Sequence, residues 1–88
     1  MSMKERISAS LQTLSPITLE VIDESENHRG HGGWREGGET HYRVIIRAQC
    51  FAGASRVDRH RQVNALLANE FARGLHALAI SAKAPGEV

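Results

Sequence analysis

The chain has little cysteine, few aromatic residues and no long apolar run. Its single cysteine, Cys50, excludes an internal disulfide and an all-cysteine metal cage, and a reduced, cytoplasmic setting is expected. Only four residues are aromatic, so the core must be mainly aliphatic. No apolar run approaches the ~20 residues that a membrane span needs, and residues 1–10 lack the apolar block of a signal peptide.

Arginine and histidine, in contrast, are plentiful. Nine of the eleven basic residues are arginine, and the 88 residues include five histidines. Residues 1–40 carry four basic and seven acidic side chains, net −3, whereas residues 41–88 carry seven basic and three acidic, net +4. With 41% hydrophobic and 24% charged residues, the sequence predicts one globular domain over residues 1–88.

Two helices are predicted from apolar spacing. Ser2 and Glu5 have the form of a capping box, and an apolar stripe follows until Ser15 and Pro16 end the helix. Ser55 and Asp58 are candidate caps of the second helix, which Gly74 ends. The two stripes are Met3, Ile7, Leu11 and Leu14, and Val63, Leu66, Leu67 and Phe71.

Three strands complete the pattern. Apolar and polar residues alternate over residues 17–23 and 41–49, with Tyr42 on an inward row and His41 on an outward row. Residues 75–82 are nearly all apolar, which predicts a central strand covered on both faces. The fold class is therefore α+β, in the order α-β-β-α-β, with a three-stranded mixed sheet whose last two strands run parallel if they are neighbours.

A long glycine-rich loop, residues 24–40, separates the first two strands, and residues 83–88 form a short tail. His28 and His31 make an H-x-x-H pattern in this loop, and imidazole is a ligand for zinc, copper, iron and nickel. Spacing alone favours a solvated loop whose histidines bind nothing, because structural metal sites usually have four ligands that include cysteine.

Three further positions have both a structural and a functional interpretation. His76 opens the last strand, where a hydrogen-bonded histidine at the edge of the core is the simpler interpretation. Four basic residues gather at the start of the second helix: Arg56, Arg59, His60 and Arg61. They either form a solvated first turn or bind an anion or an acidic partner. For Cys50, a buried or inert thiol is favoured.

At this level of detail the chain resembles the BolA family. The resemblance rests on blocks in series: residues 19–25 followed by His28, then 38–44, 51–53, 59–61 and 75–79. The strings G-E-T-H-Y, R-H-R and H-A-L-A occur within them. The resemblance implies a KH-like (class II) fold of helices and a three-stranded sheet, in agreement with the order derived above. Many family members continue into a final helix, whereas here only the short tail follows.

The resemblance also implies a function and a set of ligands. BolA proteins pair with monothiol, CGFS-type glutaredoxins and share a [2Fe–2S] cluster, to which the glutaredoxin and glutathione supply thiolates. The family histidine at the start of the last strand matches His76, and the loop ligand matches His28, with His31 as the alternative. The chain is thus expected to act as an iron–sulfur trafficking or regulatory adaptor, with no cofactor when isolated, as a monomer or weak homodimer.

Two other function classes remain at this stage. The resemblance permits a DNA-binding regulator of stress response or morphology that uses Arg56, Arg59, His60 and Arg61. Arg59 and Arg61 could instead dock an acidic partner or glutathione carboxylates. An enzyme is the least supported class, because no nucleophile is paired with a base in the sequence.

Overall fold

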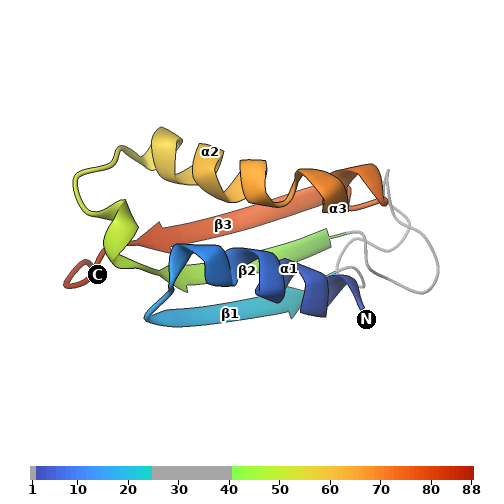
Figure 1. The fold of residues 1–88 in the computed structure, drawn as a ribbon, viewed down its shortest axis with the longest axis horizontal. Helices are drawn as coiled ribbons and strands as arrows, with labels where there is room; N and C mark the ends of the chain where they lie inside the picture. The colour runs from blue at the N-terminus through green and yellow to red at the C-terminus, as the bar shows by residue number, and fades with distance from the viewer. Residues whose placement is uncertain (1, 25–40) are drawn as a thin grey trace.

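A computed structural model describes residues 2–24 and 41–88. Helical segments precede β1, separate β2 from β3, and lie along the three-stranded sheet in Figure 1. The elements, in order, are α1 (Met3–Leu11), η1 (Gln12–Leu14), β1 (Thr18–Asp23), β2 (His41–Arg47), η3 (Gln49–Phe51), α2 (Arg56–Leu66), α3 (Ala68–Ala72) and β3 (Ala77–Lys83). The α+β class and the element order are as predicted.

Helix α1 begins and ends where local chemistry dictates. The hydroxyl of Ser2 accepts a hydrogen bond from the backbone N–H of Glu5 at 3.2 Å, and the Glu5 carboxylate accepts one from the Ser2 N–H at 3.3 Å. This confirms the capping box. The Ser2 backbone N–H, followed by its hydroxyl, lowers the pKa of Glu5. The helix tightens into η1 and stops at Ser15, whose left-handed backbone (φ 50°) precedes Pro16.

The sheet has the strand order β1-β2-β3. Strand β1 pairs antiparallel with β2, and β2 pairs parallel with β3, which confirms the mixed sheet and the parallel last pair. The prediction that the last strand is central was wrong, because β2 occupies that place and β3 lies at an edge. The small side chains of β3, which include Ala77 and Ala79, look apolar in sequence but need little cover, so they are compatible with an edge.

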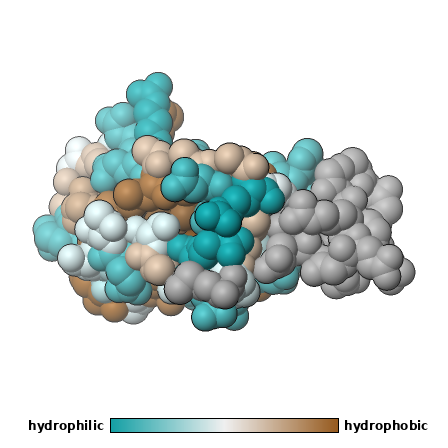
Figure 2. Space-filling view, turned by 45° about the vertical axis from the view of Figure 1, so that its right-hand side comes forward, coloured by the Kyte–Doolittle hydropathy of each residue, from teal (hydrophilic) through white to brown (hydrophobic). Residues whose placement is uncertain are grey.

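One face of the sheet carries the core. The covered face bears Val21, Tyr42 and Val44, whereas Arg43 and Ile45 lie exposed on the other face. Within the described residues the buried hydrophobic core comprises Met3, Ile7, Leu11, Val21, Tyr42, Val44, Ile46, Ala48, Phe51, Val63, Leu67, Leu75 and Ala84. Figure 2 shows hydrophobic residues bordered by hydrophilic ones on one side of the molecule. No helix in the described ranges is long and apolar enough to cross a membrane.

The second predicted helix is divided in two at Leu67. The hydroxyl of Ser55 accepts from the Asp58 N–H at 3.1 Å, so Ser55 is the cap. Leu67 departs from helical geometry (φ −101°, ψ 11°) and separates α2 from α3. The buried face continues from Val63 and Leu67 to Glu70, which is 4% exposed, whereas Phe71, predicted to be in the core, is 37% exposed. Ile17, the first residue of the predicted strand 17–23, precedes β1 and is also exposed.

Candidate functional site

His76 is presented immediately before β3 by the turn that ends α3. Gly74 has a positive φ of 121°, as predicted for a left-handed residue after the helix. The Gly74 N–H donates to the Phe71 carbonyl at 3.3 Å, and the Leu75 N–H donates to the Glu70 carbonyl at 3.0 Å. Leu75 is buried in the core and the next residue, His76, is exposed. The turn therefore anchors the backbone on one side of the histidine and leaves the imidazole accessible.

His41 lies beside His76 at the same end of the sheet. It is the first residue of β2, and the parallel register pairs it with Ala77, the first residue of β3. The two imidazole centroids are 5.3 Å apart with an interplanar angle of 57°. His41 belongs to the outward row of β2, as predicted, but it is only 4% exposed. The exposed imidazole of His76 thus lies next to the buried imidazole of His41.

The donor group that this end of the sheet exposes is the imidazole of His76. Imidazole nitrogen ligates iron in some iron–sulfur clusters, as in Rieske centres where two histidines replace two cysteines. In residues 2–24 and 41–88 no group of three or more His, Cys, Asp or Glu is placed to hold a metal. His28 and His31, the predicted loop ligands, lie outside the described residues. His76 can therefore supply one ligand, and a four-ligand cluster would need the others from elsewhere.

The basic cluster predicted at the start of the second helix is not a uniform surface. Arg59 is held inside the fold: its guanidinium donates to the carbonyls of Ala54 and Ala82, both at 3.1 Å, and to both carboxylate oxygens of Glu87 at 2.6 and 3.0 Å. Its side chain is only 12% exposed. Hydrogen bonding from Arg59 lowers the pKa of Glu87 to about 2. Arg59 therefore joins α2 to β3 and the tail.

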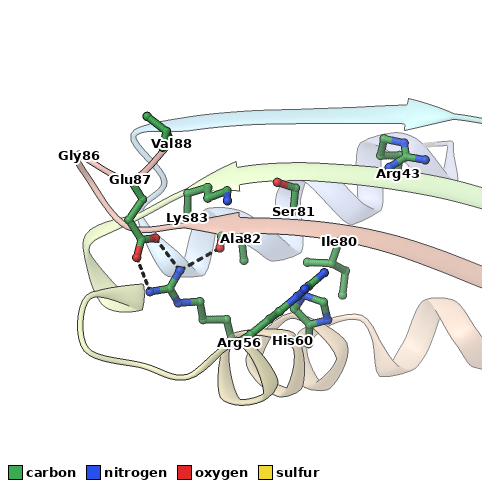
Figure 3. A pocket seen from close by; sticks show the side chains of 11 residues that line it. Arg43, Arg56, His60, Ile80, Ser81, Ala82, Lys83, Gly86, Glu87 and Val88 are labelled. Atoms are coloured by element: carbon green, nitrogen blue, oxygen red, sulfur yellow. Dashed lines mark hydrogen bonds and ion pairs between the residues drawn. The ribbon is translucent and has the colours of Figure 1, made fainter.

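The other members of the cluster point in different directions. Arg61 is 77% exposed and lies 3.5 Å from Asp58, one turn earlier on the same helix. Arg56 and His60 instead line a groove between α2 and β3, and Figure 3 shows both side chains beside Ile80 of β3. The structure thus divides the cluster into a structural arginine, an outward arginine and two groove residues.

The sequence analysis missed two contacts: the one between His41 and His76, and the one between Glu87 and Arg59. The predicted parallel pairing of the last two strands already placed the starts of these strands side by side, but His41 was given only a strand position and no role beside His76. Glu87 lies in the tail, whose lack of periodicity gave no sign that it clamps Arg59. Cys50, predicted to be buried or inert, is exposed in η3. The prediction that Cys50 is buried was therefore wrong, and the prediction that its thiol is inert stays a prediction.

Residues 11–87 match the sequence profile of BolA-like proteins. The chain belongs to the BolA-like family. Its sequence is 51% identical over 89 residues to an uncharacterized protein in the cobS 5' region of a Sinorhizobium species, covering 99% of this chain and 96% of that protein. It is 36% identical over 81 residues to the DNA-binding transcriptional regulator BolA of Escherichia coli, covering 91% and 73% of the two chains.

Structural comparison gives the same family. The BolA domain of SufE1 from Arabidopsis thaliana has a TM-score of 0.88 and 45% sequence identity, covering 100% of this chain and 98% of that domain. In the chloroplastic and mitochondrial SufE-like protein 1 of the same plant, 42% identity over 92 residues spans all of this chain but 24% of that protein. A BolA-like chain of this length therefore corresponds to one domain of a longer protein in that relative.

Proposed function

We propose that this BolA-like chain is an adaptor that shares a [2Fe–2S] cluster with a monothiol glutaredoxin and glutathione. The observation that carries the proposal is the exposed imidazole of His76, anchored before β3 and backed by His41 at a ring distance of 5.3 Å. The family membership of the chain supports it. The cluster is cargo in this proposal, and the thiolate ligands come from the partner because the one cysteine lies in η3, away from the histidine end.

In this account His76 and a loop histidine supply two nitrogen ligands. His28 is the first choice and His31 the alternative, as the sequence resemblance implies. His41 is a positioning residue, because its buried ring limits the movement of the neighbouring His76 ring. Two imidazoles and two thiolates would raise the reduction potential of the cluster relative to an all-thiolate site, as in Rieske centres. Neither chain would complete the ligand set alone.

A co-purification experiment tests the partnership and distinguishes the loop ligands. The tagged chain is expressed with a monothiol glutaredoxin, and the purified complex is analysed for iron, sulfide and glutathione. We expect a coloured heterodimer, and we expect His28→Ala to change its visible spectrum while His31→Ala does not. The reverse result assigns the loop ligand to His31. A colourless mixture of separate proteins would contradict the proposal.

DNA binding is a second proposed function, and its support is the name of the Escherichia coli relative. The exposed Arg61 and the groove residue Arg56 would contact phosphates, whereas Arg59 is already engaged by Glu87. Phosphate-driven binding must weaken steeply as salt increases. A gel-shift titration at low salt tests it: a shift that Arg56→Ala and Arg61→Ala both weaken supports DNA binding, and no shift at low salt removes it.

A further inference from the structure

A groove lies beside the C-terminal half of β3, at the far end of the strand from His76. It has a volume of about 760 Å³ and is lined by α2, by β3 from Ile80 to Lys83 and by the tail. Figure 3 shows Arg56 and His60 reaching from α2 toward Ile80. At about 3.3 Å per residue, the groove begins roughly 13 Å along the strand from His76. It is therefore a surface separate from the proposed cluster end.

The groove exposes a strand edge. Strand β3 pairs with β2 on one side only, and no strand in the described residues pairs with its other side. The Lys83 carbonyl accepts from Ala48 on the β2 side, whereas the Ala82 carbonyl accepts from Arg59 on the outer side. Because backbone groups alternate along a strand, the N–H and C=O of Ile80 also face outward, into the groove. A free edge of this kind is a template for an added strand.

The groove carries more positive than negative charge. Arg43 at its rim is paired with Glu24, and Arg59 is paired with Glu87. Lys83 makes no ion pair within 4 Å in the described residues but is near enough to Glu87 to lower its pKa, whereas Arg56 has no acidic partner in the described part of the chain. The groove already binds one carboxylate of the chain itself. The Glu87 carboxylate accepts two hydrogen bonds from Arg59 and one from the Ala84 N–H at 2.6 Å. A second carboxylate entering the groove would meet Arg56, and Lys83 lies between it and Glu87 as a further cation.

We propose that this groove binds an extended acidic peptide segment of a partner protein, which adds a strand to the free edge of β3. Main-chain hydrogen bonds to Ile80 would give affinity, and acidic side chains would meet Arg56 and Lys83. The half-buried Ile80 side chain offers an apolar contact for a residue between the acids. The volume lies in the range of about 300–1,000 Å³ that is usual for binding sites.

The lining favours a peptide over nucleic acid. No Phe, Tyr or Trp is among the lining residues, so single-stranded bases would find only the His60 ring and the arginine planes to stack on. Arg56 and Lys83 also supply few phosphate contacts, and the affinity for a nucleic-acid backbone increases with the number of phosphates neutralised. A free backbone edge, in contrast, presents donors and acceptors at the spacing of another extended polypeptide.

Fluorescence anisotropy with a labelled peptide tests the proposal. The probe is a seven-residue peptide of alternating glutamate and valine, matched to the seven residues of β3. We expect it to bind the full chain, and we expect the Arg56→Glu, Lys83→Glu double variant to weaken binding about tenfold or more. Arg61→Glu is the matched control, since Arg61 lies on the same helix but outside the groove, and it should change the affinity less than about twofold.

Three further measurements separate strand addition from simple charge attraction. A peptide with its central valine replaced by proline should bind at least several-fold more weakly, because proline removes a backbone donor. Peptide binding should slow hydrogen exchange at the Ile80 N–H. A lysine–valine peptide should not bind. Equal binding of the proline peptide, no loss in the double variant, or tighter binding of a labelled oligonucleotide that depends on Arg56 and Lys83 would each overturn the proposal.

Discussion

The ion pair between Arg6 and Glu70 provides a quantitative test of how the helices are held together. The Arg6 Nε and a Glu70 carboxylate oxygen are 2.9 Å apart, and the two side chains are 25% and 6% exposed. Replacing Arg6 with Met keeps the apolar stem but leaves the Glu70 carboxylate inside the fold without this cation. A buried acceptor that loses its partner costs about 1–3 kcal/mol, and the partial exposure of the pair keeps the expected loss near 2 kcal/mol. For a chain of 88 residues this corresponds to a melting temperature lower by about 8–16 °C.

Urea denaturation of a double-mutant cycle measures this coupling. Glu70→Leu should cost about 1 kcal/mol or less, because the partly exposed Arg6 can turn toward water. The double variant Arg6→Met, Glu70→Leu should lie within about 1 kcal/mol of the unmodified chain, since an apolar pair can replace an ion pair at little cost. The reasoning fails if Arg6→Met lowers the free energy of unfolding by less than about 0.5 kcal/mol, or if the two single losses add without coupling.

Three other predictions follow from single contacts. Glu87 has its pKa lowered from 4.5 to about 2 by Arg59, so its contribution to stability is present above about pH 4.5 and is lost as the pH falls toward 2. The melting temperature of Glu87→Gln should thus fall below that of the unmodified chain at pH 7, and the gap should close by about pH 2; a constant gap would contradict this. Leu67→Ala should lower the free energy of unfolding in urea by about 2–5 kcal/mol and Phe71→Ala by about 1 kcal/mol, because only Leu67 is fully buried. Equal losses for the two variants would instead place Phe71 in the core. Cys50 is exposed and should react with Ellman's reagent in the folded chain, whereas reaction only after unfolding would contradict its placement.

The parts of the fold that the sequence predicted depend on local chemistry. The capping box at Ser2, the cap at Ser55 and the left-handed Gly74 each follow from a few neighbouring residues. Strand alternation likewise identified the buried row that contains Val44 and Ile46. These features need no knowledge of what packs against them.

The errors arose where tertiary packing decides. The predicted stripe counted only apolar residues and so passed over Glu70, which lies three residues after Leu67 and seven after Val63 on the same helical face. Glu70 is buried there in an ion pair with Arg6 of α1, and Phe71, at the margin of that face, is exposed. The apolar composition of β3 suggested a central strand, although small alanine side chains need little cover. The contact between Glu87 and Arg59 joins residues distant in sequence, and no pattern in the tail indicated it.

The candidate site, like the fold, could be predicted from the sequence only in part. His76 stood out as a polar residue before an apolar strand, and the structure places it in an exposed position at the end of the sheet. Its neighbour His41 required the parallel register, in which the first residues of two strands come together. The division of the basic cluster required side-chain contacts, because Arg59 and Arg61 belong to the same short motif but have opposite exposures.

The most direct test of the account is whether His76 ligates a cluster held jointly with a glutaredoxin. The chain is mixed with a cluster-loaded monothiol glutaredoxin, and the visible circular dichroism of the heterodimer is recorded for His76→Ala and for the matched control His60→Ala. His60 lies in the groove on α2, so its replacement should leave the spectrum unchanged. The account predicts that His76→Ala alters or abolishes the heterodimer spectrum. An unchanged spectrum with His76→Ala would contradict it.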